Sequence, residues 1–149
     1  MARVFSAVVP VPLAASAITC SSEGFFESSR SSGTTVRVSA ERAWTDTGID
    51  VQIRDVVTIE ARSGEWSPWP GDGYDALGSG GDPRCDCNVI AGVSHAALIG
   101  KIGEGPPFLV GSEFSRPMGE SGRLYLGIND TRLDDNSGSI RVTVRVEPP

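Results

Sequence analysis

Residues 140–147 read Ile140-Arg141-Val142-Thr143-Val144-Arg145-Val146-Glu147, and this segment decides the fold class. Apolar β-branched side chains alternate here with arginine, threonine and glutamate. This period of two is typical of a β-strand that buries one face and exposes the other. We therefore predict a strand at this end of the chain, with its valines in a core.

The same alternation recurs upstream. It predicts two more clear strands, one around Leu124, Leu126 and Ile128 and one around Val57, Ile59 and Ala61. Weaker strands are predicted at 35–39, 49–53, 97–102 and 108–110, separated by turn residues at Thr47-Gly48, Gly105-Pro106-Pro107 and Ser121-Gly122. About seven or eight short strands with such turns indicate an all-β antiparallel sandwich or barrel. Residues 63–92 are predicted as one long irregular loop, and loops of that length are commonly functional.

Composition narrows the function classes. The chain has 149 residues, 18 glycines and 10 prolines, which suits one domain and argues against a helical bundle. Its net charge of -6 disfavours nucleic acid as a partner. One histidine and three cysteines are too few for a zinc cage of Cys and His or for a His-based catalytic triad. No other catalytic constellation is present in the sequence, so we do not expect an enzyme.

The N-terminal region has two open interpretations. Val4–Ala17 is apolar and ends in Ala-Ser-Ala, as a secretory leader does, but it is too short for a membrane span. Pro10 and Pro12 instead favour an extended arm that could dock on a neighbouring subunit. We predict an arm, leader or linker over 1–35, rich in Ser and Gly after residue 20, and a domain over 36–149. A leader implies an extracellular or cell-surface protein, and an arm implies a homo-oligomer.

The cysteines and the histidine give weaker signals. Cys20, Cys85 and Cys87 form an odd set, so a disulfide between Cys20 and one of the other two would leave one thiol. His95 precedes an apolar strand, and without a partner His or Cys we expect it to face solvent at the strand end.

Residues 129–139, Asn129-Asp130-Thr131-Arg132-Leu133-Asp134-Asp135-Asn136-Ser137-Gly138-Ser139, form a loop dense in oxygen donors. Asp130, Asp135 and Asn136 could converge on Ca²⁺, a hard cation that takes six to eight oxygen ligands. The same residue types also favour an ordinary hairpin turn. The residues alone leave both interpretations open.

This loop and the strand after it resemble the LecA-like family of calcium-dependent galactose-binding lectins. Three more segments look like that family in the same order, and they cover most of the chain from Val36 to Val146. These segments are 42–51 with 55–61, then Gly64-Glu65-Trp66, then 97–103 with 107–111. The resemblance implies a jelly-roll-like β-sandwich of the galactose-binding-domain type.

The resemblance also implies a ligand set for calcium. Side-chain ligands map to Asp130, Asp135 and Asn136, where Asp135 replaces an amide of the family and adds a negative charge. One backbone carbonyl maps to Leu133 or Arg132, because this loop is shorter than the family's, and a distant one maps to Trp69. Two vicinal sugar hydroxyls would then bind the ion directly.

The sugar contacts depart from the family pattern. Asp82-Pro83-Arg84-Cys85-Asp86-Cys87 stands where the lectins carry a His and a Gln, so galactose specificity does not transfer. Trp69 and Tyr74 could offer an apolar face to a pyranose ring, or could serve only in packing. The sequence therefore predicts a calcium-dependent carbohydrate-binding module. The alternative is an assembly subunit that uses the lectin fold as a building block through its N-terminal arm.

Overall fold

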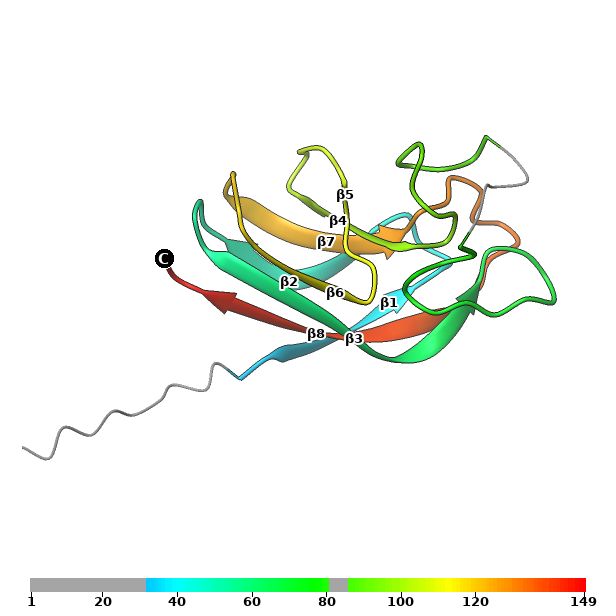
Figure 1. Cartoon of the computed structure of the whole chain (residues 1–149), viewed down its shortest axis with the longest axis horizontal. Helices are drawn as coiled ribbons and strands as arrows, with labels where there is room; N and C mark the ends of the chain where they lie inside the picture. The colour runs from blue at the N-terminus through cyan, green and yellow to red at the C-terminus, as the bar shows by residue number, and fades with distance from the viewer. Residues whose placement is uncertain (1–31, 81–85) are drawn as a thin grey trace, which may run out of the picture.

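The computed structural model describes residues 32–80 and 86–149, which form two four-stranded antiparallel sheets packed face to face (Figure 1). One sheet has the order β1-β8-β3-β6, and the other has the order β2-β7-β4-β5. The bounds are β1 Thr34–Ser39, β2 Thr45–Val51, β3 Val56–Ser67, β4 Leu98–Ile102, β5 Phe108–Leu109, β6 Glu113–Pro117, β7 Gly122–Ile128 and β8 Ser137–Glu147. No helix occurs in the described ranges, and the predicted all-β sandwich is confirmed.

Strand β8 behaves as its alternation predicts. Ile140, Val142 and Val144 are buried, and β8 lies between β1 and β3 in its sheet. The inner faces of both sheets supply one core. It contains Val36, Val38, Val51, Val57, Ile59, Trp66, Leu98, Ile102, Phe114, Leu124, Leu126, Ile128 and the three buried residues of β8, while the fourth apolar residue of β8, Val146, is partly buried against it.

Strand β3 is longer than predicted, and residues 63–67 belong to it rather than to the following loop. Its pairing with β8 shifts register between Ala61 and Ser63, so the alternation that marks the first half of the strand is interrupted. Beyond the bulge the two strands stay paired to their ends, where Trp66 lies opposite Gly138. Gly138 has φ +87°, and a Cβ there would lie 2.5 Å from the Glu65 carbonyl oxygen. This close approach requires glycine.

Two further predictions differ from the structure. Thr47-Gly48 was expected to separate strands but lies inside β2, where the pairing with β7 is irregular between Asp46 and Asp50 and Gly48 has φ +75°. Strand β6 was not predicted. It is an edge strand of its sheet with one buried residue, Phe114, so it shows no alternation to detect.

The predicted boundary at 35/36 is close to the first strand, since β1 begins at Thr34. The expectations for residues 1–31, including the leader or arm and Cys20, lie outside the described residues, as does Cys85. In the described part, no helix is long and apolar enough to span a membrane.

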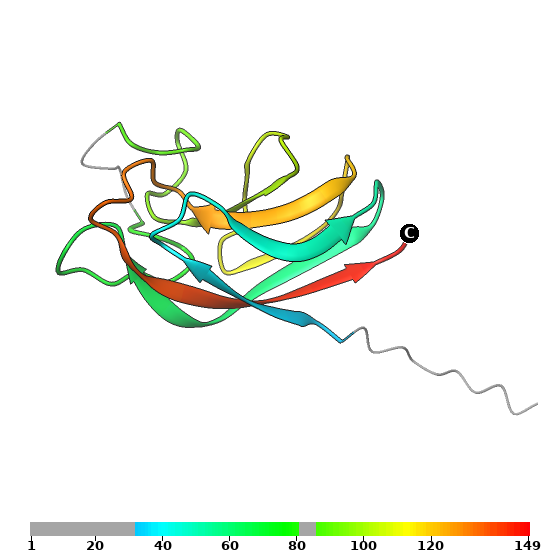
Figure 2. The ribbon, with the colours of Figure 1, turned by 180° about the vertical axis from the view of Figure 1, so that it is seen from behind.

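Two connections lie together at one end of the sandwich (Figure 1). The long β3–β4 connection and the β7–β8 loop lie together at the end far from the C-terminus, and Figure 2 shows the same grouping from behind. This end holds the predicted calcium loop.

Candidate functional site

Asn129 ties the two connections together directly after β7. Its buried side-chain oxygen accepts the Ile90 N–H at 2.8 Å, and its amide nitrogen lies 3.1–3.3 Å from the carbonyl oxygens of Ile90, Val93 and Ser94. Backbone bonds from Asn129 N to Ala97 O and from Ala96 N to Asn129 O add to this junction. A buried amide with this many partners fixes the path of the β3–β4 connection across the end of β7.

Trp66, at the end of β3, holds the same connection from the other sheet. Its buried indole N–H donates to the Ala96 carbonyl oxygen at 2.9 Å. Ala96 has φ +62°, a conformation that an L-residue adopts at a cost and that its partners must maintain. The backbone turns sharply beside His95 as a result.

A hollow of about 220 Å³ lies between these connections. Its described lining consists of Pro68, Trp69, Cys87, His95, Asp130, Arg132 and Asp135. Three of the residues predicted for the site, Trp69, Asp130 and Asp135, are therefore brought to one cavity from connections far apart in the chain.

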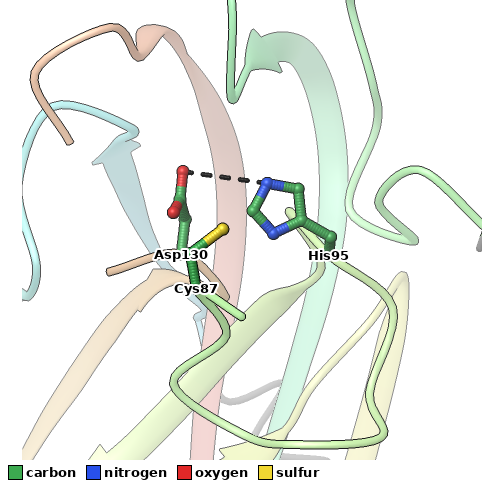
Figure 3. A group of neighbouring side chains, drawn as sticks. All are labelled: Cys87, His95 and Asp130. Atoms are coloured by element: carbon green, nitrogen blue, oxygen red, sulfur yellow. Dashed lines mark ion pairs between the residues drawn. The ribbon is translucent and has the colours of Figure 1, made fainter. Parts of the chain in front are cut away.

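Asp130 is buried at the wall of this hollow. Its Oδ1 accepts the backbone N–H of Arg132 at 2.9 Å, and its Oδ2 lies 3.9 Å from Nε2 of His95 (Figure 3). Both side chains are only 1% exposed. A carboxylate this deep is costly unless a positive charge or donors compensate it.

His95 does not face solvent, contrary to the sequence-based expectation. The Asn129 and Trp66 junctions turn the chain inward before β4, so the imidazole becomes part of the hollow's wall. The Trp69 ring stacks on it, with centroids 5.2 Å apart and an interplanar angle of 7°. Nδ1 of His95 lies 2.8 Å from Oδ1 of Asn88. The imidazole is thus held on one face and at one edge.

Asn136 carries an unpartnered oxygen. Its amide nitrogen donates to the Ala40 carbonyl at 3.1 Å, while its Oδ1 is buried without a hydrogen bond in the described structure. Because the Ala40 bond fixes the amide, the oxygen is the free end by geometry. Buried acceptors of this kind usually have a partner, and a cation is one that would suit it.

The other predicted residues take different places. Asp135 is exposed at the rim of the hollow, and its neighbour Asp134 is exposed outside the described lining. Leu133 is partly buried against the core, and its carbonyl accepts the Asn136 N–H at 3.4 Å. Tyr74 also lies outside the described lining and packs edge-on against Trp69 at a centroid distance of 5.8 Å. The Ser67 hydroxyl is placed to donate to the carbonyl of Trp69 or of Asp72.

Cys87 is buried and disulfide-bonded, and its partner lies outside the described residues. Its sulfur lies in the same group as the ligand atoms of His95 and Asp130, all within 4.8 Å of one another (Figure 3). A disulfide sulfur offers no thiolate to a metal ion.

Sequence reasoning missed His95 and Asn129 as parts of this site, and it considered Arg132 only as an alternative source of a backbone carbonyl ligand. The Asn-Asp pair at the end of β7 was a usable signal for Asn129, because an amide next to a predicted ligand at a strand end is well placed to fix a loop. His95 gave no local signal, since its position depends on a backbone turn that is set by distant residues.

The search of family models finds no match for this chain, and no curated protein matches it. Among solved structures, one described as "EclA N-terminal domain; PllA-like lectin" matches with a TM-score of 0.60 and 21% sequence identity. The match covers 80% of this chain and 100% of that chain. The fold is therefore similar to that of a PllA-like lectin domain. This likeness supports a lectin fold but does not single out the LecA-like family that the sequence resembles.

Proposed function

We propose that this chain is a calcium-dependent carbohydrate-binding module. The observation that carries the proposal is the convergence of Asp130, Asp135 and Trp69 on one hollow at the loop end of a lectin-like sandwich. Asn136 follows Asp135 in the same connection but lies outside the described lining, and its unpartnered Oδ1 is a further oxygen that a cation could bind.

The donor types suit calcium. Two carboxylates, one amide oxygen and the carbonyls proposed at Leu133 and Trp69 are all hard oxygen ligands. Asp130 is held by the Arg132 backbone and Asn136 by Ala40, so both side chains are oriented before an ion arrives. When bound, the ion would supply two coordination positions for vicinal sugar hydroxyls, and the remaining carboxylate oxygens would accept their protons in hydrogen bonds.

The walls of the hollow would hold the rest of the sugar. Pro68 and Trp69 give it an apolar side, and the exposed Arg132 gives it a donor. Sugars combine apolar C–H faces with hydroxyl edges, so such a mixed lining suits a pyranose ring. We assign Tyr74 the role of supporting Trp69, against which it packs.

The disulfide at Cys87 supports a location outside the cytoplasm, because structural disulfides persist in oxidising compartments. We accordingly propose that the module works at the cell surface or outside the cell.

Calorimetry with Ca²⁺ tests the ion. We expect one site in the full chain, abolished in Asp130→Ala and weakened in Asp135→Ala. Asp134→Ala is the matched control, because this exposed neighbour lies outside the described lining. Equal Ca²⁺ binding by the Asp134 and Asp135 variants would place the ion elsewhere.

A glycan array with Ca²⁺ and with chelator tests the sugar. We expect binding to a subset of glycans that chelator removes, and that Asp130→Ala loses. Binding that is indifferent to chelator would contradict a direct role of the ion.

A further inference from the structure

The hydrogen bonds around His95 determine which ring nitrogen carries the proton. Nδ1 faces Oδ1 of Asn88 at 2.8 Å, and the amide nitrogen of Asn88 donates to the Val93 carbonyl at 3.1 Å. Turning the Asn88 amide over would set its oxygen against the Val93 oxygen, so this orientation is the one that satisfies both groups. An amide oxygen can only accept, and Nδ1 of His95 is therefore the donor.

The other ring nitrogen then presents a lone pair to a carboxylate. In the neutral imidazole Nε2 has no proton, and it lies 3.9 Å from Oδ2 of Asp130, beyond hydrogen-bond distance. Figure 3 shows the two atoms pointing toward one another. Two buried acceptors facing each other are unfavourable unless a proton on Nε2 or a metal cation lies between them.

The spacing suits two ligands of one metal ion. In a tetrahedral zinc site with bonds of about 2.1 Å, ligand atoms lie roughly 3.4 Å apart. Closing from 3.9 Å to that value needs a movement of a few tenths of an ångström, which a small side-chain rotation supplies. The Nδ1–H···O bond to Asn88 is also the partner that metal-binding histidines use to fix ring orientation.

The nitrogen ligand changes the class of ion. Calcium takes oxygen ligands, whereas imidazole together with carboxylate suits zinc and neighbouring transition ions. We propose that the cation site of this chain binds Zn²⁺ with His95 Nε2 and Asp130 Oδ2 as ligands, in competition with Ca²⁺. This inference rests on the cation site of the proposed function and adds His95 to it. Cys87 is not counted as a ligand, because it is disulfide-bonded.

The single histidine makes the test direct. In full-length protein labelled with ¹⁵N-histidine, freed of metal by chelator and kept without reductant, the imidazole gives one set of nitrogen signals. We expect ZnCl₂ to shift the Nε2 signal to the metal-bound range at one equivalent while Nδ1 keeps its proton. CaCl₂ should leave Nε2 without that shift. Imidazole signals that ignore ZnCl₂ would overturn the proposal.

Calorimetry on variants adds a second readout. His95→Gln should weaken Zn²⁺ binding at least about tenfold, because even the loss of a residue that only hydrogen-bonds a metal ligand typically costs about tenfold in metal affinity. The same variant should leave Ca²⁺ binding nearly unchanged. Asp130→Asn keeps the His95 imidazole and the volume of the side chain at position 130, and it should weaken the binding of both Zn²⁺ and Ca²⁺. Unchanged Zn²⁺ binding in a folded His95→Gln variant would contradict the proposal, and the labelled wild-type protein decides it if that variant does not fold.

The outcomes separate this inference from the proposed function. Calcium-dependent glycan binding without a Zn²⁺ shift at His95 would support the module and overturn the zinc ligand. A Zn²⁺ shift at His95 with no glycan bound in the presence of either ion would support the zinc site and overturn the module.

Discussion

The two ends of strand β7 carry charged groups of opposite character. Near its start, the Arg123 guanidinium lies 2.8 Å from an oxygen of Asp50 and 3.2 Å from one of Asp46, and all three side chains are substantially exposed. Just after its end, Asp130 faces His95 at 3.9 Å, and both are buried. In the first cluster, each carboxylate is paired with the Arg123 guanidinium. The second places a buried carboxylate opposite a buried imidazole nitrogen.

At the exposed end, the charged side chains shift one another's pKa. Hydrogen bonds with Asp50 and then Asp46 raise the pKa of Arg123 above its usual value. The pKa of Asp46 is lowered, chiefly by the hydrogen bond from the Gly48 backbone N–H and further by Arg123. Exposed pairs of this kind are screened by water and contribute little to stability. At the exposed end, water and Arg123 compensate the carboxylates, whereas Asp130 is removed from water, so a bound cation would stabilise the buried carboxylate more than the exposed ones.

Removal of the Asn129 side chain, which holds the loops beside Asp130 and His95, should have the largest effect on stability. Asn129→Ala removes four hydrogen bonds to Ile90, Val93 and Ser94, and it leaves the partly buried N–H of Ile90 without this partner. We expect a loss of about 3 kcal/mol or more in the free energy of unfolding, since each lost hydrogen bond costs about 0.5–1.5 kcal/mol and an unsatisfied buried donor costs about 1–3 kcal/mol. Urea unfolding monitored by tryptophan fluorescence measures it. A loss as small as that of a surface substitution would show that the junction is not needed to hold the loops.

Calcium should stabilise the wild-type protein by a comparable amount. An ion that binds only the folded state at about 100 times its Kd adds roughly 2.7 kcal/mol. Thermal melts with excess Ca²⁺ and with chelator measure the difference, and Arg123→Ala, at the opposite end of β7, should keep it in full. A melting temperature indifferent to chelator would count against the site.

Asp130→Asn should sharpen the comparison without an ion. The amide Oδ1 can still accept the Arg132 N–H, while the new Nδ2 replaces the oxygen that faces Nε2 of His95. A donor then meets an acceptor, so we expect the chelated variant to gain about 1 kcal/mol over chelated wild type, the usual net value of one hydrogen bond. Chelated wild type that is clearly more stable than the variant would mean that the carboxylate is already compensated.

The exposed end should give the smallest and most pH-dependent effect. Because the folded state lowers the pKa of Asp46 below 3.8, its contribution is present above that value and is lost as the pH falls through the folded pKa. We expect Asp46→Asn to melt slightly below wild type at neutral pH, with the gap closing below about pH 3.8 and shrinking in 1 M NaCl. A gap that persists at low pH would mean that Asp46 acts through packing.

Much of the fold could be predicted from the sequence because strand periodicity is local. The alternation of Ile140, Val142 and Val144 places the same face inward in any sandwich, and these residues are buried. The prediction failed where the local pattern is absent or misleading, as in the edge strand β6 and at Thr47-Gly48, which lies within an irregular stretch of β2.

Part of the candidate site was equally visible. Asp130, Asp135 and Asn136 lie within one short loop, so a cluster of side-chain oxygen ligands can be recognised from residues that are close together in the sequence. The sequence by itself therefore determined the strand faces, the all-β class and the acidic donors. It also indicated a lectin-like fold.

Only the tertiary structure decided which residues complete the site. His95 and Trp69 meet Asp130 because the Asn129 and Trp66 side chains pin the β3–β4 connection across the end of β7. The tertiary structure also fixes the Asn136 side chain, because its amide nitrogen donates to the Ala40 carbonyl oxygen. Its Oδ1 is therefore left without a hydrogen bond in the described residues. The physical reason is that these contacts are long-range hydrogen bonds between buried groups. They have no period in the sequence and form only once both sheets have packed.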